Sequence, residues 1–159
     1  MRKGNCIRKK IYLIIILATL ILLCGCSKSD LLKINWGISM PKPIEIKIIH
    51  NFDFKEGDDI EIWKYETSKV EKIRDKNEFI RIDENNLTDI ENYLNQYYEG
   101  LSYDESIQEK FSDNIPIEEL VMEGNYYSLI KAEEKHTNCY LLMILDTESN
   151  YLYFLNHIR

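Results

Sequence analysis

Glycine and proline are scarce in this chain of 159 residues, which holds six glycines and three prolines. The glycines stand singly, so the sequence contains neither a Gly-rich phosphate loop nor a Gly-x-Ser-x-Gly nucleophile turn. It also contains no His-Glu-x-x-His and no Cys-x-x-Cys, the local signatures of zinc sites. The sequence therefore predicts no metal, no cofactor and no catalytic residue, and it favours a protein that is not an enzyme.

Acidic residues are absent from the first 25 positions, although the whole chain carries 27 Asp and Glu. Five basic residues occur there, and an apolar run from Ile11 to Leu23 follows, interrupted by Thr19. Thirteen residues at ~1.5 Å rise make a helix of roughly 20 Å, which is short of the ~30 Å hydrocarbon core of a membrane. This pattern is typical of a cleaved export signal, and the alternative is an uncleaved single-pass anchor.

The next residues, Leu23-Cys24-Gly25-Cys26, resemble the lipobox of bacterial lipoproteins, in which an apolar residue, a small residue and Gly or Ala precede the acylated cysteine. Cys24 stands where Ala or Ser is usual, but it is small and weakly polar. The resemblance implies cleavage after Gly25 and diacylglycerol on the Cys26 thiol. Two or three acyl chains anchor durably at ~0.8 kcal/mol per buried methylene. We therefore expect a lipid-anchored protein on the extracytoplasmic face of the cell membrane.

This resemblance divides the chain into three parts. Residues 1–25 are the predicted signal peptide, residues 26–43 hold the lipidated cysteine, a short spacer and an extended segment, and residues 44–159 form one small domain. Cys139 is the single cysteine left after acylation, so no intrachain disulfide is expected. Its apolar surroundings favour a buried side chain over a reactive thiol. The mature part also resembles small lipoproteins of Gram-positive bacteria, which implies no specific activity.

Removal of the signal peptide makes the protein more acidic. Its five basic residues leave with it, so 15 Lys and Arg remain against 27 Asp and Glu, a net charge of about −12. Such a charge repels nucleic acid and attracts cationic partners. We therefore expect no nucleic-acid partner. The expected partners are the membrane, through the lipid, and an envelope protein or a cationic peptide.

Apolar and polar residues alternate from Leu32 to Met40, which predicts an extended segment with one apolar edge. Pro41 and Pro43 end it, because proline cannot continue a hydrogen-bonded ladder. Two positions for this segment stay open. It packs on the domain as an edge piece, or Trp36 rests at the headgroup level, where tryptophan is favoured.

Residues 44–159 predict an α+β domain, an antiparallel sheet of about five to six strands with helices mainly on one face. Both faces of the last hairpin are apolar, which predicts a central or covered position for it. The expected strands are 44–54, 60–65, 79–82, 126–133, 138–145 and 150–157.

The clearest predicted helix is 87–101, with Thr88 and Glu91 as a possible cap pair and Gly100 at its stop. A short helix that buries Val70 and Ile73 is expected behind a capping box. The residues of that box are Thr67 or Ser68 together with Glu71, and further helices are expected at 103–112 and 116–122.

His50 is expected on the apolar strand face formed by Ile44, Ile46 and Ile48. A histidine in such a place could act as base, ligand or pH switch. No partner cluster accompanies it in the sequence. A core or edge histidine with satisfied hydrogen bonds is therefore the favoured interpretation.

The acids of the Glu56–Asp59 turn surround Gly57 and raise the question of calcium. An EF-hand loop needs oxygen ligands at positions one and three when glycine is sixth, and here those positions hold Phe52 and Phe54. We therefore interpret the turn as an acidic hairpin tip.

Tyrosine is abundant, with eleven residues, and it offers contact area at low cost in rotamer entropy. Two interpretations stay open, ordinary half-buried packing and a shallow aromatic recognition surface. The candidates for that surface are Tyr93, Tyr97, Tyr98, Tyr126 and Tyr127.

Three functions agree with the sequence. The favoured one is a membrane-anchored, non-enzymatic binding or accessory module, because the chain combines a lipidation motif with no catalytic motif. The second is a self-immunity lipoprotein that captures a cationic antimicrobial peptide, which the acidic balance suggests. The third and least favoured is a small envelope hydrolase that uses scattered carboxylates.

Overall fold

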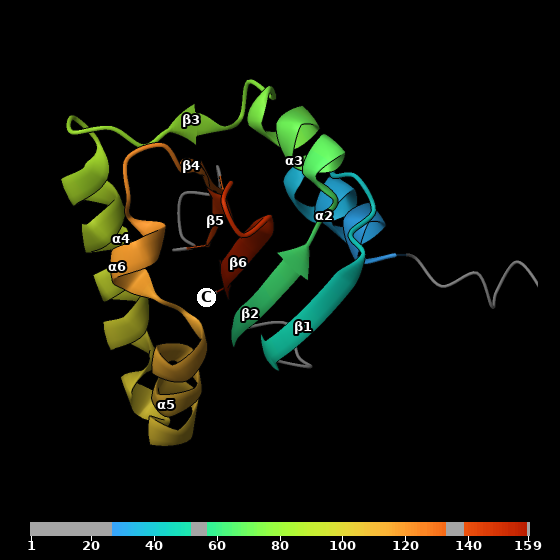
Figure 1. Ribbon diagram of the computed structural model, residues 1–159. Helices are drawn as coiled ribbons and strands as arrows, with labels where there is room; N and C mark the ends of the chain where they lie inside the picture. The colour runs from blue at the N-terminus through green and yellow to red at the C-terminus, as the bar shows by residue number, and fades with distance from the viewer. Residues whose placement is uncertain (1–26, 52–56, 133–138, 159) are drawn as a thin grey trace, which may run out of the picture. The chain divides into compact units, whose positions relative to one another are not determined.

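The computed structural model describes residues 27–51, 57–132 and 139–158 (Figure 1). The chain divides into two compact units, one ending at Ser39 and the other beginning at Met40. The predicted signal peptide, Cys26, Phe52, Phe54 and Glu56 lie outside the described residues. Within the described ranges, no helix combines the length and the apolar character that a membrane crossing requires.

The second unit is built on a six-stranded antiparallel sheet in the order β1-β2-β6-β5-β4-β3. The predicted α+β class is therefore confirmed. β5 and β6 lie inside the sheet, as their apolar faces predicted. The strands are β1 (Glu45–His50), β2 (Gly57–Lys64), β3 (Ile80–Arg81), β4 (Tyr126–Lys131), β5 (Tyr140–Asp146) and β6 (Tyr151–Ile158).

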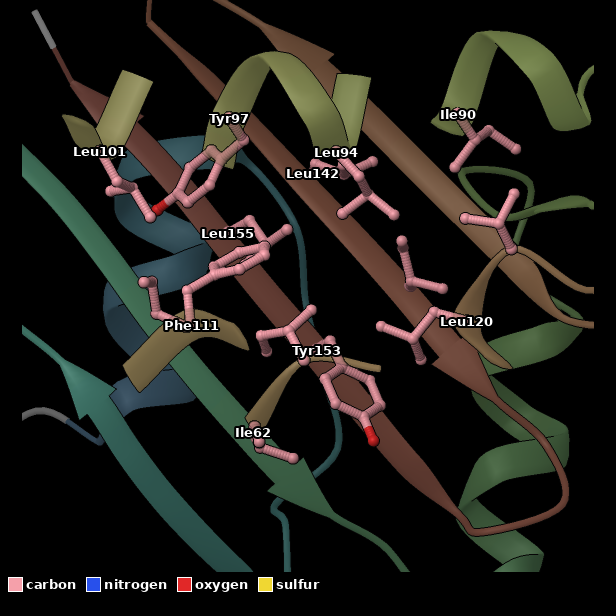
Figure 2. Packing of buried hydrophobic residues seen from close by; sticks show 14 of the residues in the cluster. Ile62, Ile90, Leu94, Tyr97, Leu101, Phe111, Leu120, Leu142, Tyr153 and Leu155 are labelled. Carbon is pink, nitrogen blue, oxygen red and sulfur yellow. The ribbon is translucent and has the colours of Figure 1, made fainter. Parts of the chain in front are cut away.

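The main hydrophobic core lies between one face of this sheet and the helical layer that covers it. Figure 2 shows Leu94 and Tyr97 of helix α4 (Leu87–Gly100) above the sheet residues Leu142 and Leu155, and Ile90 of the same helix belongs to the same buried cluster. Burial of such side chains contributes roughly 1.5–3 kcal/mol each. The helical layer consists of α4 (Leu87–Gly100), the short 3-10 helix η1 (Leu101–Tyr103), α5 (Glu105–Asn114) and α6 (Ile117–Leu120).

The opposite face of the central strands is apolar and buried as well. Trp63 of β2 and Phe154 of β6 have ring centroids 4.2 Å apart, and Met143 of β5 is fully buried. Trp63 donates a hydrogen bond from Nε1 to Glu61 Oε2 at 2.8 Å, which gives the buried carboxylate a partner. Two buried faces explain why β5 and β6 read as nearly continuous apolar runs.

Helix α3 (Thr67–Arg74) buries Val70 and Ile73 as predicted, but its predicted capping box is wrong. Its N-cap is Glu66, whose side chain makes no cap hydrogen bond. Thr67 and Ser68 do not act as N-caps, because they already lie inside the first turn.

The cap pair predicted for α4 is also wrong. Its N-cap is Asn86, which makes no side-chain cap bond. The Asn86 side chain instead donates to Arg81 O at 2.9 Å and accepts from Asp83 N at 3.0 Å, and thereby fixes the preceding loop.

Residues Lys28–Trp36 form helix α2, so the predicted extended conformation is wrong up to Trp36. Ser27 and Asp30 form a capping box, in which Ser27 N donates to Asp30 Oδ2 at 3.0 Å. The hydrogen bonds from Ser27 lower the pKa of the Asp30 carboxyl. Gly37, with φ of 72°, ends the helix, and its N–H donates to Lys33 O at 3.1 Å. These terminal signals override the alternation, and Ile34 is 70% exposed.

A β-bulge in β1 corrects the predicted position of His50. Ile48 pairs with Glu61 and His50 with Ile60, so Ile49 is one extra residue in the ladder. The extra residue moves His50 to the helix-covered face, while Ile46 and Ile48 stay on the other. Ile49 packs against the core cluster and Ile48 is 52% exposed.

Candidate functional site

Tyr97, one of the five predicted surface tyrosines, belongs to the core and not to a surface. It is 2% exposed, and its hydroxyl lies 3.2 Å from Asp59 O and 3.3 Å from Asn156 O (Figure 2). Burial raises the pKa of Tyr97 well above its ordinary value. The phenol is therefore a neutral link between α4 and the β2–β6 pair.

The other four predicted tyrosines do not form one surface with each other. Tyr93 of α4 accepts a hydrogen bond from Lys131 Nζ at 3.0 Å, whereas Tyr98 packs on Phe111 with ring centroids 5.6 Å apart. Tyr126 and Tyr127 are adjacent in β4, so their side chains point to opposite faces of the sheet. Ordinary packing accounts for these residues better than a single aromatic patch.

An open groove lies between α4, α5 and α6, which Figure 1 shows side by side on one side of the sheet. Its volume is about 450 Å³. Phe111 and Ile115 are buried and form its floor, and the Tyr98 ring packs against Phe111. The residues that line this α4–α6 groove are Asn95, Tyr98, Phe111, Ser112, Ile115, Pro116, Ile117, Glu118 and Glu119.

The wall formed by α6 is held in place by Asn125, which is 7% exposed. Its side-chain amide donates to Glu119 O and Leu120 O, both at 3.2 Å, and its Oδ1 accepts from Thr147 N at 3.3 Å. Thr147 belongs to the turn between β5 and β6. A buried, well-paired amide therefore ties a helix of one turn to the centre of the sheet.

A second hollow, of about 390 Å³, continues the groove along the outer face of α4. It shares Asn95 and Tyr98 with the α4–α6 groove. Its other lining residues are Asn92, Gln96 and Glu99. Side-chain amides both donate and accept hydrogen bonds, so this row can bind peptide-like polar groups.

The acidic charge of the protein is concentrated around this groove. Residues 82–125, which contain α4 to α6, hold 12 Asp and Glu and one basic residue, Lys110. Their formal charge of −11 is nearly the whole −12 of the predicted mature chain. Glu118 and Glu119 are exposed, and neither has an ion-pair partner in the described part of the chain. Two cations of the sheet approach this layer: Lys47 Nζ donates to Asn114 Oδ1 at 2.6 Å, and Lys131 Nζ donates to the Tyr93 hydroxyl at 3.0 Å.

A buried polar cluster lies at one end of the sheet. Asp58, 2% exposed, pairs through Oδ1 with His157 Nδ1 at 2.6 Å, and Tyr103 donates to Asp58 Oδ2 at 3.2 Å. The His157 ring also lies 5.0 Å from that of Tyr140, between centroids. The cluster links η1 to β2, β5 and β6 and satisfies a carboxylate that burial would otherwise destabilise.

This cluster corrects the interpretation of the Glu56–Asp59 turn as a hairpin tip. Gly57, Asp58 and Asp59 belong to β2, and Asp58 faces inward opposite His157. The pair is separated by 99 residues, so only knowledge of the strand register could have revealed it. Asp58 lies on the same strand face as Ile60, and His157 lies on the same strand face as Leu155. This period of two was the signal in the sequence that both polar side chains face inward.

His50 is half-buried, and its Nε2 atom has no hydrogen-bond partner among the described residues. The expectation of satisfied hydrogen bonds is therefore wrong for this atom. The pKa of nearby Asp104 is lowered chiefly by hydrogen bonds from Ser106 and least by the charge of His50. Asp104 is the N-cap of α5.

Cys139 is of intermediate exposure and precedes β5, so it is less buried than predicted. Across the described ranges, no group of three or more His, Cys, Asp or Glu side chains is arranged to hold a metal ion. Among the residues that line the α4–α6 groove, Tyr98 was predicted as part of a recognition surface. The others were not predicted, because they come from three helices and carry no motif.

No protein-family model, curated protein or solved structure matches this chain.

Proposed function

We propose that the protein is a lipid-anchored, extracytoplasmic binding or accessory module, that it is not an enzyme, and that the α4–α6 groove is its binding site. The observation that carries the binding role is the lining of the groove. Accessible apolar surface of the half-buried Tyr98, Pro116 and Ile117 lies over the buried Phe111 and Ile115. It is bordered by Asn95, Ser112 and the carboxylates of α6. Ligand sites typically combine apolar area with a few polar groups that fix orientation.

The anchoring part of the proposal rests on the lipobox-like residues Leu23 to Cys26. The described residues begin at Ser27, and helix α2 begins at Lys28. A lipid on Cys26 would therefore leave almost no flexible spacer before folded structure. Such a short connection keeps the protein near the membrane surface, where a binding module meets other envelope proteins and peptides.

Site-specific photocrosslinking in intact cells tests the binding role. A photoreactive phenylalanine analogue at Ser112 lies in the groove, whereas the same analogue at the exposed Glu71 on α3 lies outside its lining. We expect a discrete crosslinked product from position 112 and none from position 71. Products of equal yield at both positions, or no product at position 112, would contradict the proposed site.

A further inference from the structure

We propose that the α4–α6 groove binds a short cationic, amphipathic peptide segment, with apolar side chains on the floor and basic side chains along the acidic rim. This inference names the partner class of the site described above and therefore rests on the proposed function. Three features of the described residues support it: the floor, the charge of the rim and the amide row of α4.

The floor requires apolar side chains from the partner. Phe111 is fully buried and Ile115 is 3% exposed, while Pro116 and Ile117 are half-buried beside them. Partner side chains in the groove would remove from water the apolar surface that Tyr98, Pro116 and Ile117 still expose there, at about 25 cal/mol per Å². A uniformly polar or charged segment would leave that surface without a partner.

The rim requires basic side chains from the partner. The two ionisable acids in the lining, Glu118 and Glu119, are exposed and have no ion-pair partner within the described ranges. The whole layer around them carries a formal charge of −11, with Lys110 as its single cation. A potential of one sign over a concave surface raises the local concentration of oppositely charged partners. Lys47 lowers this potential at the C-terminal end of α5, and Lys131 lowers it beside Tyr93 on α4, but neither lysine lines the groove.

The hollow along α4, which contains the amide row of Asn92, Asn95 and Gln96, sets the length of the segment that fits beside it. Asn92 and Glu99 are seven residues apart on α4, which corresponds to about 10 Å along a helix axis. An extended chain advances ~3.3 Å per residue, so roughly three or four residues fit along the row. The amides of Asn92, Asn95 and Gln96 can pair with the backbone of that segment, whatever its side chains.

The test measures binding of a synthetic hexapeptide of alternating leucine and lysine to the purified mature lipoprotein in neutral detergent. Two matched peptides replace every lysine with glutamate or every leucine with serine. We expect binding of the leucine–lysine peptide only. Raising NaCl from 0.1 to 1 M shortens the screening length from about 10 to about 3 Å, so affinity should fall roughly fivefold or more.

Two double variants separate the groove from the general charge of the layer. E118Q/E119Q removes two charges from the lining, whereas E105Q/E109Q removes two exposed charges from α5 outside it. We expect the first to weaken binding about fivefold and the second less than about twofold, because exposed charge pairs act locally and weakly. Equal weakening by both would overturn the proposal, since it would show attraction without a site.

Asn95→Trp keeps every charge and places an indole where the groove meets the hollow along α4, so it should abolish peptide binding while circular dichroism shows an unchanged fold. Full binding by this variant would also overturn the inference. If photocrosslinking from position 112 captures a partner but the leucine–lysine peptide does not bind, this inference fails and the proposed function stands. If neither occurs, both fail.

Discussion

At the scale of single residues, two buried tyrosines, Tyr97 and Tyr153, pack in the core between the sheet and the helices. Tyr153 of β6 is 7% exposed, and burial is the main reason that the pKa of Tyr153 is raised to about 12. Burial also raises the pKa of Tyr97 well above its ordinary value. Both hydroxyls ionise more readily in the unfolded chain, where the pKa is near 10.

These pKa values predict a loss of stability at alkaline pH. A raised pKa in the folded state gives a contribution that is complete below pH 10 and is lost as the pH rises from 10 through 12. Tyr153→Phe should flatten this fall, by about 1.4 kcal/mol per pH unit at most. Urea unfolding at pH 8, 10 and 11 measures it.

Tyr126→Phe on β4 is the matched control, because it removes a hydroxyl from a side chain that is less buried. A slope that stays as steep in Tyr153→Phe as in the unsubstituted protein would contradict the assigned cause.

At the scale of elements, α6 is a single turn whose position depends on Asn125. A helix this short is not stable alone, because nucleation costs more than four residues return. Asn125 supplies the missing stability by bonding Glu119 O, Leu120 O and Thr147 N. The groove therefore depends on a residue that does not line it.

Asn125→Ala should lower the free energy of unfolding by roughly 2–3 kcal/mol, because it leaves buried carbonyl and N–H groups without a partner. It should also raise hydrogen exchange at Leu120 N, which normally donates to Pro116 O at 2.9 Å. Asn95→Ala, an exposed amide on α4, is the control and should change neither quantity. Unaltered exchange at Leu120 in Asn125→Ala would show that the amide does not hold α6.

The elements also show what the sequence could predict. Strong periodicity identified α4 and the last hairpin, since burial on one or two faces dictates their residue types. Alternation failed in α2, where the Ser27 capping box and Gly37 decide the conformation locally. It failed again in β1, where one extra residue, Ile49, reverses the face of His50.

The candidate site was harder to predict than the fold. Asp58 and His157 meet only through strand pairing, and the groove joins residues of three helices whose packing no local pattern records. The acidic balance was visible in the sequence. The concentration of acidic residues in residues 82–125 could be assigned to one side of the sheet only from the structure, because those residues form the helical layer over one face.

At the scale of the whole molecule, the proposed lipid at Cys26 would tether a domain whose acidic helical layer holds an apolar groove. Apart from residues 82–125, the predicted mature chain carries 14 basic and 15 acidic residues and is nearly neutral. This asymmetry gives the domain one strongly negative side. A cationic partner would therefore be attracted to the side that holds the groove, over distances up to about the 8 Å screening length at physiological salt.

Lipid attachment at Cys26 is the central claim, and mass spectrometry of the protein purified from membranes of its host tests it most directly. The account predicts an N-terminal peptide that begins at Cys26 and carries diacylglycerol, and it predicts the same product from Cys24→Ser. Cys26→Ser should carry no lipid and retain its N-terminal segment. Recovery of an unmodified Cys26 in a chain that still begins at Met1 would contradict it.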